Sequence, residues 1–479
     1  MSTEERNPQS ADSASIDRRS AVAAGLAVVA GAWSRTTVAG QEHVRHTTPV
    51  DTRPLPSATA TLTDAPAQRP GLPGRDYTPV ITPNGTTLPF RVVKGVKIFH
   101  LVAESVAHEF APGLQAECWG YNGRTSGPTI EAVEGDRVRI YVTNRLPAAT
   151  SVHWHGILLP SGMDGVSGLS QAPIPPGATF KYEFTLRQHG TFMYHSHRDE
   201  MTQIALGMMG MFVVHPRAAS GRRPDKDFVL LSSEWRVVPG TKRPDPNEMV
   251  EFNVLTFNGK AFPGTAPLMV QQNDRVRIRL GNLSPMSHHS IHIHGHAWTL
   301  VGTDGGDIPE SARWPEVTQL VPVGNTRTLE FVADNPGDWA LHCHMTHHTM
   351  TQMGHSGVNV LGVDPAIIDR AVQPLLPRYM TMATSGMAEM GEMGMPLPKN
   401  SIPMLGAPGP HGPIDMGGMF TVMKVRERLQ PGDEASWWEA PPGTLASAAS
   451  DDELSADGID VHAVSRPATI HRHPGISSP

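Results

Sequence analysis

The stretch GDRVRIYVTN at residues 135–144 returns almost unchanged as NDRVRIRLGN at residues 273–282. In both copies charged and apolar residues alternate, which is typical of a β-strand with one face on a hydrophobic core. A second pair of similar segments, PGATFKYEF at 176–184 and VGNTRTLEF at 323–331, lies further along the chain. This repeated set of strands predicts two copies of one β-domain.

The repeat divides the 479 residues into two predicted domains, residues 86–217 and residues 225–430. Short β-type runs separated by turn residues fill both, and the 46 glycines and 44 prolines also favour turn-rich structure. The second domain contains a methionine-rich insertion at about residues 365–415, and the polar residues 431–479 are predicted to form a flexible tail. The expected fold class is all-β.

The first 40 residues read as an export signal. Arg18 and Arg19 precede a weakly apolar run from Ala21 to Ala32, which is too short to span a bilayer. Paired arginines before such a run indicate a twin-arginine signal, so a periplasmic or extracellular location is expected. Residues 41–85 are rich in proline, threonine and alanine and are interpreted as a linker.

The composition excludes several classes of protein. A net charge of −7 provides no basic surface for nucleic acid. The chain has no other run of about 18 apolar residues, so no membrane span is expected. Two cysteines cannot form a disulfide framework. The 24 histidines and 23 methionines stand out, because both side chains bind copper and other soft or borderline metals.

Each domain contains two His-X-His elements, which lie at residues 153–155, 195–197, 292–294 and 342–344. Alternation along a strand directs the two imidazoles of each element to the same face. Neutral imidazole is a good ligand for copper, zinc, iron or nickel. Eight imidazoles are too many for one ion, so the pattern predicts a polynuclear metal site to which both domains contribute.

Cys343 lies between His342 and His344 and must therefore point to the opposite face of its strand, where it needs separate partners. A thiolate with two imidazoles and a weak axial thioether is the ligand set of blue-copper sites. The first domain has Ser196 at the position of Cys343. Only the second domain is therefore expected to hold a thiolate site.

Candidate partners for the thiolate lie on both sides of it in the sequence. His348 is five residues downstream, and Met353 is five residues beyond that, with Met350 as a second axial candidate. Upstream, the segment HHSIHIHG offers His288 and His289. The remaining cysteine, Cys118, is interpreted as a buried strand residue.

The segments HWHG, HSH, HHSIHIHG and HCHMTHHTMTQM together resemble the motifs of the laccase-like multicopper oxidases, over roughly residues 85–430. The resemblance implies cupredoxin-like Greek-key domains and about four copper ions per chain. It implies that type 1 copper binds His289, Cys343, His348 and Met353, that type 2 copper binds His153 and His292, and that the two type 3 coppers bind His155, His195 and His344, and His197, His294 and His342.

The same resemblance implies oxidation of a small-molecule or metal-ion reductant and reduction of O2, with Cys343, His342 and His344 carrying electrons between the copper centres. Asp164, shortly after HWHG, is similar to the family's proton-relay acid, although an Asp-Gly turn would also explain it. Asp199 and Glu200 are further candidates. Two-domain relatives pair the first domain of one subunit with the second domain of the next, which implies a homotrimer.

Several alternatives remain open. The reductant could be a phenol, an aromatic amine, Cu(I) or Mn(II). A copper nitrite reductase or a copper-storage or electron-carrier protein would use fewer of the histidines, so copper per chain distinguishes them. The methionine-rich insertion could bind Cu(I) and screen substrates, or could pack as a surface loop. His288, His296 and His347 are not ligands in the family pattern.

Overall fold

The computed structural model describes residues 68–218, 221–351, 367, 370–371, 374–375, 399–403 and 406–463. The predicted signal, most of the linker and of the methionine-rich insertion, and the axial candidate Met353 lie outside the described residues. None of the described helices is long and apolar enough to cross a membrane.

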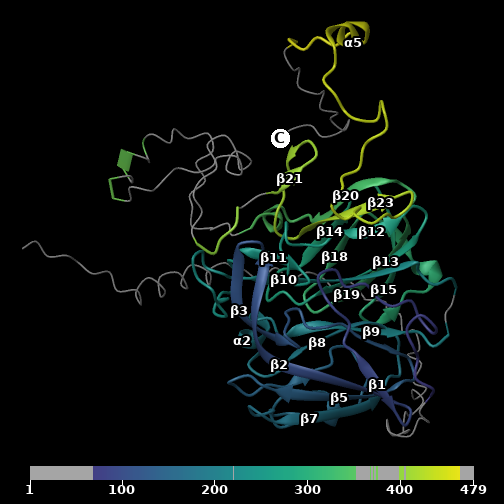
Figure 1. The fold of residues 1–479 in the computed structure, drawn as a ribbon, viewed down its shortest axis with the longest axis vertical. Coiled ribbons are helices and arrows are strands. Elements are labelled where there is room, and N and C mark those ends of the chain that lie inside the picture. The colour runs from purple at the N-terminus through teal and green to yellow at the C-terminus, as the bar shows by residue number, and fades with distance from the viewer. Residues whose placement is uncertain are drawn as a thin grey trace, which may run out of the picture. The chain divides into compact units, whose positions relative to one another are not determined.

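Two sheets form the first half of the described chain (Figure 1). One contains, in order, β1 (Phe90–Val93), β2 (Val96–Ala111), β5 (Arg137–Asn144) and β7 (Thr179–Thr185), with β3 (Leu114–Tyr121) paired to β2. The other contains β4 (Ile130–Val133), β9 (Met209–His215), β8 (Gly190–Ser196) and β6 (Val152–His153). Apolar side chains from both sheets, Trp154 and Tyr194 among them, form one buried core.

Two further sheets form the second half. One contains β11 (Val254–Phe257), β10 (Lys226–Trp235), β13 (Arg275–Asn282), β19 (Thr326–Val332), β15 (Trp298–Thr303) and β16 (Gly306–Asp307), with β17 (Trp314–Glu316) paired to β15. The other contains β12 (Leu268–Gln271), β23 (Phe420–Arg426), β20 (Gly337–Cys343), β14 (His289–Ile293) and β18 (Thr318–Val321).

Short elements connect or follow these sheets. They are η1 (Ser161–Met163), α2 (Glu200–Ala205), η2 (Glu310–Ala312), η3 (Thr346–Thr349), the hairpin β21 (Pro408–Gly409) and β22 (Gly412–Pro413), and α5 (Asp451–Ala456). Of these, α2 and η3 matter for function, because each follows a strand that carries predicted metal ligands at its end, β8 with His195 and β20 with Cys343.

The strand pairing repeats as the sequence does. In the first half β5 lies parallel to β2 and antiparallel to β7, with Arg139 opposite Glu183. In the second half β13 lies parallel to β10 and antiparallel to β19, with Arg277 opposite Glu330. The predicted all-β fold built from two copies of one sandwich is therefore confirmed.

The two sandwiches share an apolar layer. Met193 and Met211 of β8 and β9 pack with Leu231 and Trp235 of β10, and all four side chains are buried. The long β2–β3 hairpin extends alongside β10 and β11 in Figure 1 and brings Phe110 edge-on to Trp235. Burial of this layer fixes one sandwich against the other.

Chain segments outside the sandwiches also pack on them. Tyr77 and Val80, within the predicted linker, are buried, and Tyr77 stacks on His215. After β23, the Trp437 ring lies under Lys424 of that strand, and the Trp438 backbone N–H donates to Asp338. The first residues of the predicted tail therefore lie against the second sandwich.

Candidate metal centres

The thiolate site forms where three elements of the second sandwich meet. His289 begins β14, Cys343 ends β20 and His348 lies on η3. The Cys343 Sγ atom lies 3.7 Å from His289 Nδ1 and 3.5 Å from His348 Nδ1, and the two nitrogens lie 3.1 Å apart. Three donors bonded to one ion at about 2.0–2.3 Å would lie about 3.5 Å apart. The donor set and its spacing therefore fit a copper ion.

Hydrogen bonding orients the His289 ring. Its Nε2 lies 2.6 Å from Ser284 Oγ, which leaves Nδ1 directed at Cys343 and His348. Burial lowers the pKa of His289 to about 3 and raises the pKa of Cys343 to about 11. The imidazole is thus ready to bind a metal, whereas the thiol must lose its proton to do so.

A buried carboxylate supports the loop before His289. Glu234 of β10 is buried, and its Oε1 accepts hydrogen bonds from the backbone N–H groups of Met286 and Ser287. Its Oε2 is buried and has no hydrogen-bond partner. Desolvation raises the pKa of Glu234. Neither Glu234 nor Ser284 belongs to a motif, so sequence reasoning missed both residues.

Four histidines cluster at one edge of the first sandwich. The His153 ring centroid lies 5.7, 5.4 and 5.4 Å from those of His155, His195 and His197, respectively. His155 Nδ1 lies 3.3 Å from His195 Nε2. Strand alternation accounts for the arrangement, since Trp154, between two of these histidines, is buried in the core.

The second sandwich contains a matching cluster. The His292 ring centroid lies 4.8, 5.7 and 5.4 Å from those of His294, His342 and His344, respectively. His294 Nε2 lies 3.1 Å from His342 Nε2. Each cluster thus contains one close pair of imidazole nitrogens suited to a common ion and two further imidazoles.

Backbone carbonyls determine which ring nitrogen is available. His195 Nδ1 donates to the carbonyl of Ser196, and His342 Nδ1 donates to the carbonyl of Cys343, both at 2.9 Å. His153 Nδ1 donates to Asp164 O and His292 Nδ1 to Val317 O, both at 2.8 Å. A carbonyl oxygen can only accept, so in all four rings Nε2 has a free lone pair for a metal.

The two clusters remain separate within the chain. Within the described residues, each ring contact between two of these eight histidines joins members of the same cluster. His294 and His344 are exposed, and a cavity of about 700 Å³, lined by His292, His294 and His296, opens beside them. The eight histidines that were predicted to form one polynuclear site thus lie in two groups of four.

The first sandwich has a neutral hydrogen-bonded group where the second has its thiolate site. Ser196 corresponds to Cys343 in the repeat, and Thr150 corresponds to His289. Gln203 Oε1 accepts hydrogen bonds from Ser196 Oγ at 2.6 Å and from Thr150 Oγ1 at 2.7 Å. The three side chains are buried and satisfy one another, so this position fits no metal ion.

The predicted acids lie near the first cluster. An Asp164 carboxylate oxygen is 3.5 Å from His153 Nδ1. Glu200, on α2, is 3.3 Å from His197 Nε2, and Asp199 is the residue before that helix. In the second sandwich Thr349, the residue after His348, donates its hydroxyl to Thr346 O.

The histidines outside the family pattern have other surroundings. His288 is exposed and accepts a hydrogen bond from the Val323 backbone N–H. His296 packs edge-on against Trp339, and its buried Nε2 has no partner. His347 is exposed on η3.

Family models described as multicopper oxidase match residues 103–219 and residues 239–360. The chain belongs to the multicopper oxidase family. Among solved structures, the multicopper oxidase mgLAC is similar, with a TM-score of 0.52 and 25% identity over 70% of this chain and 87% of that one. The blue copper oxidase of Nitrosomonas europaea shares the fold, with a TM-score of 0.52 and 24% identity over 70% of this chain and 92% of that one. The predicted family is thereby confirmed.

Curated relatives match over a smaller part of their length. Copper resistance protein A of Pseudomonas syringae pv. tomato is 29% identical over 40% of this chain and 39% of that protein. Copper resistance protein A of Escherichia coli is 26% identical over 58% and 52%, respectively. Laccase-1 of Cryptococcus neoformans var. grubii is 32% identical over 40% and 35%. The chain therefore spans about half or less of the length of these relatives.

Proposed function

We propose that this multicopper oxidase is laccase-like: it oxidises a reducing substrate one electron at a time and reduces O2 to water. The observation that carries the proposal is that the end of β20 contributes residues to both the thiolate site and a histidine cluster. Cys343 meets His289 and His348 on one side of the strand, while His342 and His344 belong to the histidine cluster on the other. Copper, when bound, supplies the one-electron redox chemistry and the reduction of O2, with about four ions per chain.

The residues of the thiolate site would hold type 1 copper. His289, Cys343 and His348 would bind it, and Met353, which lies outside the described residues, is the predicted fourth ligand. Cys343 is bonded through the backbone to both His342 and His344. In addition, the Cys343 carbonyl accepts a hydrogen bond from His342 Nδ1. These links give electrons a short path from the sulfur to the cluster.

The eight clustered histidines would hold the remaining ions. His153 and His292 would bind type 2 copper through the Nε2 atoms that their carbonyl contacts leave free. One type 3 copper would use His155, His195 and His344, and the other would use His197, His294 and His342. The two close nitrogen pairs, His155 with His195 and His294 with His342, support this division, because each pair belongs to one ion.

Two carboxylates can move protons to the cluster. Asp164 lies beside His153 and is 34% exposed, so its carboxylate can exchange protons with solvent and pass them inward. Glu200 is 44% exposed and lies nearest to His197. We assign the relay to Asp164 first, because Glu200 must turn away from His197 Nε2 before that nitrogen can bind a metal.

Separation of the two clusters requires a second copy of the chain. A head-to-tail contact places the first cluster of one subunit on the second cluster of the next, and three such contacts close a homotrimer. Both sandwiches have exposed apolar side chains in segments that come after cluster histidines in the chain. Such side chains support the burial of this surface at a contact between subunits. They are Leu158, Leu169 and Met201 in the first sandwich, and Val317, Leu320 and Met345 in the second.

The candidate reductants are phenols, aromatic amines, Cu(I) and Mn(II). The similarity to relatives named laccase supports an organic reductant for this chain, and the similarity to relatives named copper resistance protein A supports Cu(I). Nitrite reduction is disfavoured, because the neutral group of Ser196, Thr150 and Gln203 leaves no blue-copper site in the first sandwich. We further propose export by the twin-arginine route, on the strength of Arg18 and Arg19.

The test combines copper counting with oxygen uptake. The purified protein should bind about four copper ions per chain and consume O2 with at least one of the four reductants. Cys343→Ser should lose the blue absorption band and substrate oxidation while losing about one copper per chain. Cys118→Ala, at the other buried cysteine, is the matched control and should keep both properties. Two coppers per chain, or oxygen uptake unaffected by Cys343→Ser, would overturn the proposal.

A further inference from the structure

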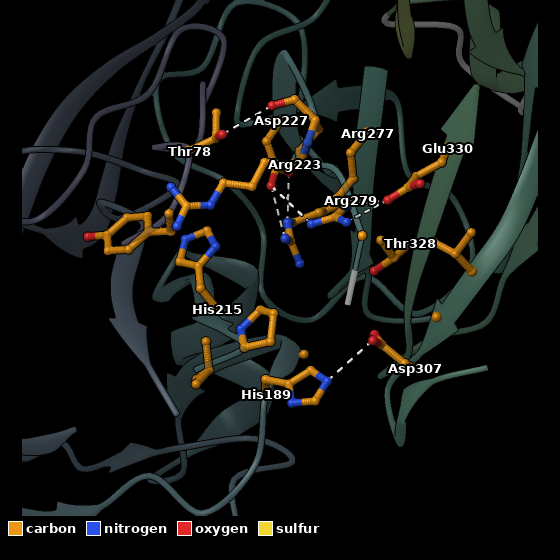
Figure 2. A pocket seen from close by; sticks show the side chains of 18 of the residues that line it. Thr78, His189, His215, Arg223, Asp227, Arg277, Arg279, Asp307, Thr328 and Glu330 are labelled. Carbon is orange, nitrogen blue, oxygen red and sulfur yellow. Dashed lines mark hydrogen bonds and ion pairs between the residues drawn. The ribbon is translucent and has the colours of Figure 1, made fainter. Parts of the chain in front are cut away.

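A polar cavity of about 90 Å³ lies where the two sandwiches meet (Figure 2). His189 and His215, at the ends of strands in the first sandwich, form one side. Arg277 and Arg279 of β13 form the other. A single water needs only about 10–15 Å³ on this measure, so the space can accommodate an anion of several heavy atoms.

Several arginines line this cavity because apolar and basic side chains alternate along β13. Val276 and Ile278 face the core, so Arg275, Arg277 and Arg279 all point outward from the sheet. The outward face of β13 is the one that lies against the first sandwich, where Arg279 donates to Thr191. Of the three side chains, Arg279 is buried at 4% exposure, while Arg277 and Arg275 are 22% and 38% exposed.

The carboxylates on the cavity do not balance these charges. Six arginines and four carboxylates line it. Asp227 accepts two hydrogen bonds from Arg279, which makes that pair neutral. Glu330, however, is shared between Arg275 and Arg277. Arg277 also lies 3.6 Å from Asp227, so three guanidinium groups share two carboxylates, and Glu330 is only 8% exposed.

The equivalent arginines in the first copy of the repeat have different surroundings. There Arg137 and Arg139 share Glu183 in the same way, on the outer face of β5, and both guanidinium groups reach solvent. In the second copy the equivalent group adjoins the cavity, with Arg277 22% and Arg275 38% exposed. The excess positive charge is thus only partly removed from water, and an anion in the cavity would balance it.

Two further arginines at the cavity have no recorded carboxylate partner. Arg223 donates to the carbonyl of Arg75, and Figure 2 shows its side chain beside His215. Arg313 donates to the carbonyl of Ile308. Their remaining N–H groups are available to a ligand. His189 is held between Glu134 and Asp307, so it closes this side of the cavity without adding a free donor.

We propose that this cavity binds one small polyvalent oxyanion of the phosphate type, which joins the two sandwiches of a chain. Guanidinium groups bind the oxygens of such anions in pairs, through planar and charge-assisted hydrogen bonds. The ligand contacts residues of both sandwiches and therefore stabilises their packing. The site is separate from the histidine clusters and does not depend on copper chemistry.

Calorimetric titration of the copper-loaded protein with inorganic phosphate, at constant ionic strength in chloride, tests the proposal. The expected result is saturable binding of one phosphate per chain. The variant Arg223→Gln with Arg313→Gln, which leaves the paired arginines of β13 intact, should bind phosphate at least about tenfold more weakly.

A second double variant controls for net charge. Arg145→Gln with Arg428→Gln removes two charges at exposed positions outside the cavity lining and should bind phosphate as the unmodified protein does. Blue absorption and the melting temperature without phosphate establish that both variants are folded. Absence of saturable binding to the unmodified protein, or equal affinity in the two double variants, would overturn the proposal.

Discussion

Mixing two inactive variants should restore activity if each copper cluster is shared between subunits. His197→Ala disables the first cluster of a chain and His294→Ala disables the second, and both side chains are assigned to the same type 3 copper. Neither substitution touches the thiolate site, so each variant should keep its blue absorption. Each variant alone should be inactive in oxygen uptake.

The size of the restored activity follows from the assembly. In a trimer assembled from equal amounts of the two variants, each contact joins a first cluster and a second cluster chosen independently. Half of the first clusters and half of the second clusters are intact, so about one quarter of the contacts have all eight histidines. The intact second cluster lies on the chain whose Cys343 serves it, so these contacts are complete.

Co-expression of the two variants with different affinity tags provides the mixed assembly. Purification on both tags in succession selects trimers that contain both variants, and oxygen uptake is measured per type 1 copper. Two-tag trimers exclude the pure assemblies, which raises the expected activity to about one third of the unmodified value. The two variants mixed as separately purified, non-exchanging proteins are the negative control.

Absence of activity in two-tag assemblies would refute shared clusters. So would oxygen uptake near that of the unmodified protein, because it would mean that single histidine losses leave a cluster working. A cluster closed within one chain predicts zero activity in every mixture.

Three further outcomes test other parts of the structure. Arg279→Met should cost about 3 kcal/mol in chemical denaturation, because buried Asp227 loses two hydrogen bonds and keeps only the 3.6 Å contact with Arg277. Arg139→Met, at a side chain that is 30% exposed, should cost at most about 1 kcal/mol, and equal costs would contradict the burial argument. Burial lowers the pKa of His108 from 6.5 to about 4. The stability that neutral His108 provides is therefore present above pH 6.5 and is lost as the pH falls through 4. His108→Gln should remove about 3 kcal/mol of this acid sensitivity when the free energy of unfolding is measured against pH. Glu234→Gln keeps a side-chain oxygen that can accept hydrogen bonds from Met286 and Ser287 but removes a negative charge. Redox titration at alkaline pH should therefore show a type 1 potential raised by about tens of millivolts. An unchanged potential would show that Glu234 acts only on the loop.

Local pattern in the sequence predicted most of the fold. The alternation in residues 135–144 and 273–282 predicted β5 and β13, because period-two burial is a property of each strand by itself. The His-X-His elements predicted which imidazoles share a face for the same reason. The structure brings them together as two clusters and places Cys343 with His289 and His348.

Contacts between distant residues could not be predicted in the same way. Glu234 precedes Met286 by 52 residues and supports its backbone without belonging to any pattern. Gln203 completes the neutral group at Ser196 because α2 folds back over β8, and no spacing in the sequence indicates that turn. The arginines of β13 were visible, but their position at a cavity follows from how the two sandwiches pack.

The carbonyl contacts of the histidine rings have a consequence for how the protein acquires its metals. The rings of His195 and His342 are oriented by the peptide groups of their own neighbours through Nδ1. A copper ion that binds Nε2 of these rings therefore has less side-chain order to create. Metal binding there should consequently cost less conformational entropy than binding to histidines that rotate freely.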